Sequence, residues 1–258
     1  MNTSTRTAGM GAGYARPSEA EVADRVAAAR GDGARVRLEG AHTLKHALRF
    51  GADIEVVATD DRAGLLALLA DLAPDVVEEV AARVVQLSPA RWQRLVPRPL
   101  PSPCLAVALR PRVAVNDVLQ APGRILVLDR PRHLGNLGAA IRVAAAAGAG
   151  GVLTLGRADP WHPTALRAAA GLQFALPTTA TEVLPVTDRP VVALDPGGTP
   201  LHEAPLPADA LLLVGTERGG LDDALLARAD ERRAIAMRTG VSSLNLATAV
   251  AVALYADR

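Results

Sequence analysis

The chain has 258 residues, of which 50% are hydrophobic and 21% are charged, and its formal net charge is +1. This balance excludes disorder for most of the chain and allows a sizeable core, in one large domain or two smaller ones. The single cysteine, Cys104, excludes an intrachain disulfide and a cysteine-based zinc cluster, so we expect a reducing, cytoplasmic setting. We expect neither a secretory signal nor a membrane span, because the apolar runs are too short.

The first elements along the chain predict a small α/β unit. Residues 1–17 are small, polar and aperiodic, which predicts a disordered tail, and Ser18 with Glu21 forms a capping box before a helix. From Val36 we expect a short strand or turn, a helix HTLKHALRF, a strand IEVVAT, helices LLALLADL and VVEEVAARV, and a strand CLAVAL. The proline-rich VPRPLPSPC and a boundary at 116–123 then close a predicted domain of residues 18–115.

A basic stretch lies late in this unit. Between Glu79 and Asp117 there is no acidic residue, and Trp92 stands among six arginines: Arg83, Arg91, Arg94, Arg98, Arg110 and Arg112. Arginine forks suit phosphate oxygens and an indole can stack on a base, so the stretch could bind RNA. A solvated basic face with Trp92 in the core explains the pattern equally well.

The remaining elements predict a second domain, residues 116–258. They run strand ILVLD, helix AAIRVAAAAG, strand VLTLG, helix TALRAAAG, strands VVAL and LLLVG, helix DDALLARA, strand RAIAM and helix LNLATAVAVALY. Repeated strand–helix units indicate a parallel sheet covered on both faces, and thus the α/β class. Ligands in such folds bind at the carboxyl ends of the strands.

The first of three polar loops lies between ILVLD and its helix. Gly135 and Gly138 are three residues apart, and neither a Rossmann fingerprint nor a P-loop is present, so a dinucleotide or ATP site is disfavoured. Asn136 and Arg142, at the helix start, could face one site across the first turns. An N-cap asparagine and a surface arginine would explain the same residues.

The other two loops follow later strands. Gly215 and Glu217 end the strand LLLVG, where a carboxylate suits polar recognition or a turn. The last loop leads into a helix that is apolar on nearly every side, which predicts a buried helix. We expect Asn245 to lie in its first turn and to need partners, because an unpaired buried amide costs roughly 1 to 3 kcal/mol.

Together the loops read NxGxxxR, GxExxG and IxMxxxxxSLN, and in this order they resemble the three motifs of the SpoU, or TrmH-like, branch of the SPOUT methyltransferases. The resemblance covers residues 124–255. It implies a parallel sheet with a deep trefoil knot, a homodimer, S-adenosylmethionine as cofactor and 2′-O-methylation of a ribose in RNA without a metal. Departures are Ala236, where relatives usually have proline, and Ala169, where serine is common.

The resemblance also implies the roles of particular residues. Its catalytic and structural positions are Asn136, Arg142, Glu217, Ser243 and Asn245. Its cofactor positions are Gly215, Ile235 and Leu244, with Met237 beside them. The family's arginine is described as activating the 2′-hydroxyl. Because arginine is always protonated, we expect Arg142 rather to orient a phosphate and stabilise developing alkoxide charge.

The segment LEGAHTLKHALRFGADIEVVAT resembles an L30e-like RNA-binding domain. Relatives with such a domain more typically act on ribosomal RNA, so we expect rRNA rather than tRNA as substrate. A tRNA 2′-O-methyltransferase remains an alternative. So does a non-catalytic RNA-binding protein that keeps the knot, although the retained motif residues argue against it.

Overall fold

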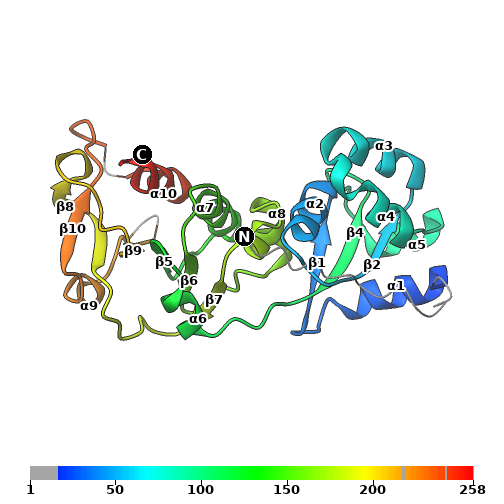
Figure 1. Ribbon diagram of the computed structural model, residues 1–258, viewed down its shortest axis with the longest axis horizontal. Coiled ribbons are helices and arrows are strands. Elements are labelled where there is room, and N and C mark those ends of the chain that lie inside the picture. The colour runs from blue at the N-terminus through cyan, green and yellow to red at the C-terminus, as the bar shows by residue number, and fades with distance from the viewer. Residues whose placement is uncertain (1–16, 217–218, 242, 258) are drawn as a thin grey trace, which may run out of the picture.

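The computed structural model describes residues 17–216, 219–241 and 243–257 (Figure 1). The predicted tail, except for Pro17, lies outside these ranges. The described residues form a four-stranded sheet, in the order β1-β4-β2-β3, and a six-stranded sheet, in the order β10-β8-β9-β5-β6-β7. The two sheets lie side by side along the long axis (Figure 1). Within the described ranges, no helix has the length and apolarity that crossing a membrane requires.

The first sheet contains β1 (Arg35–Glu39), β2 (Ile54–Thr59), β3 (Val84–Gln86) and β4 (Leu105–Leu109). β4 is antiparallel to β1 and β2, and β2 is parallel to β3. The helices around it are α1 (Glu19–Ala28), α2 (Ala41–Arg49), α3 (Arg62–Leu72), α4 (Val77–Arg83) and α5 (Pro89–Leu95), with a 3-10 turn η1 (Pro74–Val76). The predicted capping box is confirmed at the start of α1, where the Glu21 amide donates to Ser18 Oγ at 3.2 Å.

The predicted helix VVEEVAARV is present as α4 but ends one residue early, at Arg83, because Val84 and the following Val85 pair with β2. A ladder with a neighbouring strand outweighs the weak local helix preference here. The short strand β3 was not predicted. The domain boundary at 116–123 remains a prediction; this stretch contains most of a helix, α6 (Val115–Gln120), where Asp117 accepts from the Ala114 amide at 2.9 Å.

The second sheet is parallel in every pairing, as predicted. Its strands are β5 (Ile125–Asp129), β6 (Gly151–Leu155), β7 (Thr178–Thr181), β8 (Val191–Pro200), β9 (Leu211–Val214) and β10 (Glu231–Ala234). One face packs on α7 (Leu134–Ala146), α8 (Pro163–Ala168) and α10 (Leu246–Tyr255). The other packs on α6 and α9 (Asp223–Leu226). A short turn η2 (Leu172–Ala175) lies between α8 and β7, and another, η3 (Leu201–Glu203), lies between β8 and β9. The strand order does not show whether the chain is knotted, so the trefoil knot remains a prediction.

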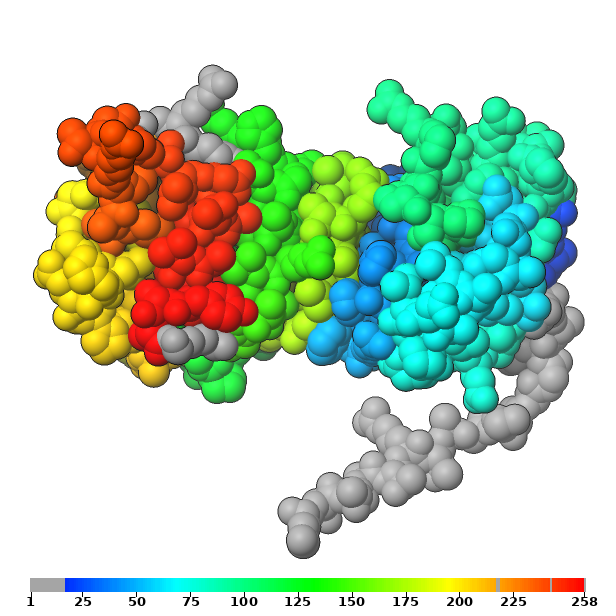
Figure 2. Space-filling model, turned by 90° about the horizontal axis from the view of Figure 1, so that it is seen from above, coloured from blue at the N-terminus to red at the C-terminus, as the bar shows by residue number. Residues whose placement is uncertain are grey.

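An apolar seam joins the two units. Trp161 and Leu166, from the second unit, are buried in the core cluster of the first, where Trp161 meets Phe174 edge-on at 5.0 Å. Beside it, His46 of α2 donates from Nδ1 to the Ala170 carbonyl oxygen at 2.8 Å. The seam therefore brings α2 next to α7 and α8, and Figure 2 shows α10, α7, α8 and α2 following one another across the upper face.

Candidate functional site

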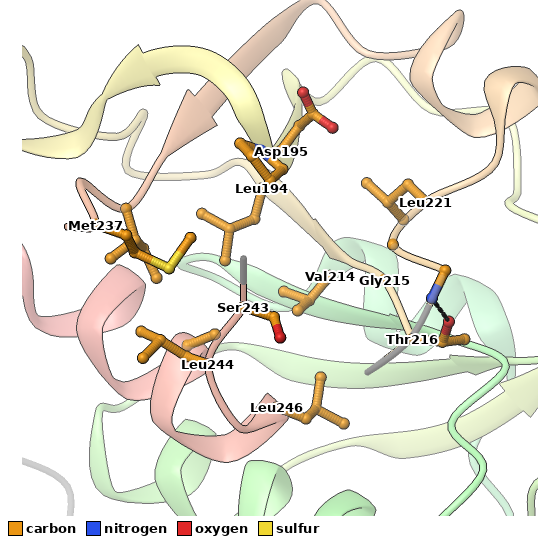
Figure 3. A pocket seen from close by; sticks show the side chains of 15 residues that line it. Leu194, Asp195, Val214, Gly215, Thr216, Leu221, Met237, Ser243, Leu244 and Leu246 are labelled. Atoms are coloured by element: carbon orange, nitrogen blue, oxygen red, sulfur yellow. Dashed lines mark hydrogen bonds between the residues drawn. The ribbon is translucent and has the colours of Figure 1, made fainter. Parts of the chain in front are cut away.

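A cavity of about 500 Å³ opens where the parallel pairing of β8 and β9 ends, at Leu194 and Val214. Its walls are the middle of β8, the loops that follow β9 and β10, and the first turn of α10 (Figure 3). This is the carboxyl edge of the sheet, where α/β folds bind ligands, and its volume lies in the range of small-molecule sites. The cavity is therefore the candidate ligand site.

All four residues that the resemblance implies for the cofactor line this cavity, namely Gly215, Ile235, Met237 and Leu244. Ser243 lines it as well. Figure 3 shows Met237 entering from the side opposite Thr216, with Ser243 and Leu244 between them at the base of α10. Residues from the loop after β9 and the loop after β10 thus converge on one space. Strand β10 ends at Ala234, earlier than the predicted strand RAIAM.

The loop after β9 explains the glycines of its motif. Thr216 and Gly220 exchange two backbone hydrogen bonds of 3.1 Å each, which closes a tight turn. A Cβ on Gly215 would lie 2.2 Å from the Gly220 carbonyl carbon, and Gly220 itself has a φ of +61°. Both positions therefore require glycine for steric reasons. Glu217, predicted as a site residue, lies outside the described residues.

Asn245 connects the last loop to the first. Its Oδ1 accepts from the Ala247 amide at 2.9 Å, which makes it the N-cap of α10, and its Nδ2 donates to Asn136 Oδ1 on α7 at 3.1 Å. The predictions that Asn245 lies inside the first turn and is buried are wrong, because it precedes the helix and is exposed. Its expected need for a partner is met by Asn136.

Helix α10 is less buried than its apolar composition predicts. The residues that face the core are Leu246, Val250, Ala253 and Leu254. On the opposite side, Val252 is 40% exposed and Tyr255 is 45% exposed. The helix is apolar all round yet only half covered in one copy of the chain. An apolar surface of this kind is typical of a contact with another protein surface.

Arg142 does not join the two asparagines. Six residues turn a helix by about 600°, so Asn136 and Arg142 leave α7 about 120° apart. Arg142 is exposed and does not line the cavity. Arg142 instead lies near enough to α2 to act on His42. Burial of His42, followed by the positive charges of Lys45 and Arg142, lowers the pKa of this histidine.

Gly138, the glycine of NxGxxxR, has a packing role. A Cβ there would lie 2.2 Å from the Ala165 carbonyl oxygen and 2.7 Å from Ala168 Cβ, both on α8. The absence of a side chain lets α7 and α8 touch. This contact sets the position of α7, and with it the positions of Asn136 and Arg142.

Sequence reasoning missed the wall formed by β8. Leu194 and Asp195 line the cavity, and Asp195 Oδ1 accepts from the Gly197 amide at 2.9 Å. The signal was present as an aspartate directly after the apolar strand VVAL, followed by Pro and Gly. It resembles an ordinary turn, and only the pairing of β8 beside β9 places it at the site.

The basic stretch is not one continuous patch. Three of its arginines form ion pairs, Arg83 with Glu79, Arg91 with Glu19, and Arg110 with Asp159. Trp92 packs against the core cluster under α1 and α5. The structure therefore favours the interpretation of Trp92 as a core residue, and leaves Arg94, Arg98 and Arg112 exposed.

A model of the SpoU rRNA methylase family matches residues 123–255, which is half of the chain and contains every predicted site residue. The chain belongs to this family. Membership in this family confirms the prediction of an α/β RNA ribose methyltransferase, and with it the family's cofactor, S-adenosylmethionine. The chain resembles the crystal structure of an RNA 2′-O ribose methyltransferase, with 28% identity, a TM-score of 0.71 and coverage of 93% of this chain and 95% of that one.

Two further relatives are informative. The 23S rRNA (guanosine(2553)-2′-O)-methyltransferase RlmP of Bacillus subtilis is 28% identical over 84% of this chain and 86% of its own length. The structure of AviRb from Streptomyces viridochromogenes with AdoMet has a TM-score of 0.73 at 24% identity, and covers 90% of this chain and 95% of its own. At that identity the second likeness concerns the fold alone.

The cavity suits the family's cofactor on its own chemistry. Leu194, Val214, Ile235 and Leu246 offer apolar surface to an adenine ring, while Ser243 and the glycine turn offer polar groups to a ribose and an amino acid. Such a mixture, apolar walls with a few polar groups, is what small-molecule sites usually have.

Proposed function

We propose that the chain methylates a ribose 2′-oxygen of ribosomal RNA in the cytoplasm, with S-adenosylmethionine bound among Gly215, Ile235, Met237 and Leu244. The observation that carries the proposal is the convergence of all four residues on one cavity, from the separate loops that follow β9 and β10. Ribosomal RNA is supported by RlmP, and by the 23S rRNA (uridine(2479)-2′-O)-methyltransferase of Streptomyces viridochromogenes, 31% identical over half of each chain.

The bound cofactor supplies an electrophilic methyl group on its sulfonium. The Asn136–Asn245 hydrogen bond fixes the start of α10, and so holds Ser243 and Leu244 against the cavity. The guanidinium of Arg142 orients an RNA phosphate and stabilises the charge that develops on the attacking oxygen. The family resemblance assigns polar recognition to Glu217. Holding both reactants in line accounts for much of the rate enhancement.

We propose also that the first unit is an L30e-like RNA-binding domain ending near residue 115.

We propose further that two copies of the chain pair through α10. The exposed side of α10 carries a stripe of residues spaced four and three apart, namely Thr248, Val252 and Tyr255. A second copy would cover this stripe and could place its Arg142 nearer the cavity than the same chain does. Light scattering should then give twice the chain mass, and Tyr255→Glu should give a monomer; a wild-type monomer with full activity would refute the pairing.

The function is tested by mapping ribose methylation in the ribosomal and transfer RNA of strains with and without the gene. We expect one rRNA nucleotide to lose its 2′-O-methyl group, and to regain it with the wild-type gene but not with Arg142→Lys. Loss of a methyl group from tRNA alone would replace rRNA as the substrate. If calorimetry detects no binding of S-adenosylmethionine to the purified chain, the catalytic proposal fails and a binding protein remains.

A further inference from the structure

A second cavity, of about 490 Å³, lies on the first unit. Arg30, Arg37, Glu39, residues 95–101 and Arg167 of α8 form its walls. In Figure 1, β1 and α5 lie towards one end of the long axis and β8 and β10 towards the other, so this cavity is distinct from the cofactor cavity. Pro97, Pro99 and Pro101 make its outer wall an extended, stiff segment.

The walls carry an uncompensated positive charge. Four arginines line the cavity, Arg98 included, against the single carboxylate of Glu39. Glu39 is already ion-paired with Arg167, and its Oε1 lies 3.7 Å from Arg37 Nη2. Arg30 donates to a neutral carbonyl oxygen, that of Leu95, at 2.7 Å. Arg98 is exposed and makes no ion pair with any described residue.

Arg37 is the residue that points to an anionic ligand. It is only 6% exposed, yet its Nη2 is 3.5 Å from the Leu95 carbonyl oxygen, the long limit of a hydrogen bond. Its buried Nε has no hydrogen-bond partner among the described residues. Burial, followed by repulsion from Arg30, lowers the pKa of Arg37, but a guanidinium still keeps its proton. A buried cation with few partners is costly, and an entering anion would remove much of that cost.

We propose that this cavity binds a phosphate group of the RNA backbone through Arg30, Arg37 and Arg98. This proposal depends on the proposed function in one respect, namely that the bound RNA is the RNA that the chain methylates. Guanidinium forks match phosphate oxygens in geometry and charge. A backbone contact so far from the cofactor cavity adds affinity and fixes the orientation of the RNA, but carries no base specificity.

The test measures binding of the full chain to 23S rRNA from a strain without the gene, over a series of KCl concentrations. Each lost phosphate contact lowers the slope of log affinity against log salt by about 0.7 to 0.9. Arg98→Ala should show that decrease, with several-fold weaker binding at low salt, and Arg98→Lys should largely restore it. The matched control is Arg94→Ala, which removes an exposed arginine of α5 that does not line this cavity; its slope should equal that of the wild type.

Equal slopes for Arg98→Ala and Arg94→Ala would overturn the proposal. Either neither arginine would contact a phosphate, or both substitutions would act only through the net charge of the chain. Inorganic phosphate without RNA distinguishes the two sources of the anion. If phosphate raises the melting temperature of the wild type but not of Arg98→Ala, while the RNA slopes of both agree, the cavity binds free phosphate and the RNA assignment is wrong. Affinity for S-adenosylmethionine, measured in parallel, should be unchanged in all three variants, so failure here is separable from failure of the methyltransferase proposal.

Discussion

The two glycines at the start of α7 should respond in opposite ways to the same substitution. Gly138→Ala would place a Cβ 2.2 Å from the Ala165 carbonyl oxygen. That oxygen already accepts from the Ala169 amide at 2.9 Å, so α8 cannot retreat there without straining its own last turn. Gly135→Ala, three residues earlier in the same helix, meets nothing within 4 Å.

The magnitudes follow from two competing effects. Alanine stabilises a helix by about 0.5–1 kcal/mol relative to glycine, whereas overpacking costs about 1–3 kcal/mol. Gly135→Ala should therefore raise the free energy of unfolding by up to about 1 kcal/mol. Gly138→Ala should lower it by about 1–2 kcal/mol, or roughly 2–8 °C in melting temperature.

Urea unfolding followed by circular dichroism measures both variants against the wild type. Gly138→Ala should also weaken binding of S-adenosylmethionine under conditions where the chain is still folded, because displacement of α7 moves Asn136 away from Asn245. A Gly138→Ala variant as stable as Gly135→Ala would refute the assigned contact between α7 and α8. If Gly135→Ala and Gly138→Ala were both less stable than the wild type, contact with α8 would not explain the need for glycine at the start of α7.

Two further substitutions test the site and the seam. Gly215→Ala should weaken binding of S-adenosylmethionine at least ten-fold by calorimetry, because its Cβ would collide with the backbone of Gly220; an unchanged affinity would contradict the turn's role. Burial lowers the pKa of His46, so the unfolded chain binds more protons and stability falls as the pH drops below about 6.5 towards the folded-state pKa. Between pH 7.5 and 5.5 the urea midpoint should fall less in His46→Gln than in the wild type; an identical fall would exclude His46 as a source.

The periodic parts of the chain were predictable, because apolar strands such as ILVLD and LLLVG form a buried parallel sheet wherever helices can cover it. The three loops were found by their motif residues, and motif residues of the second and third loops line one cavity. These features depend on short stretches of sequence.

The errors came from contacts between distant segments. Val84, the last residue of the predicted helix VVEEVAARV, pairs with β2 instead. Asn245 was expected to be buried because α10 is apolar, yet the face that carries Tyr255 remains uncovered in a single chain. Asp195 joins the site only because β8 pairs with β9. No local pattern contains that information.

The seam at Trp161 limits how the two halves could have been recombined. The indole is 3% exposed and lies in a hydrophobic cluster made mostly by residues of the other half. A second half grafted onto a different partner would leave this ring and Leu166 in water, and the first half alone would have a gap in its core. Replacement of either half by an unrelated domain would therefore require matching changes on both sides of the seam.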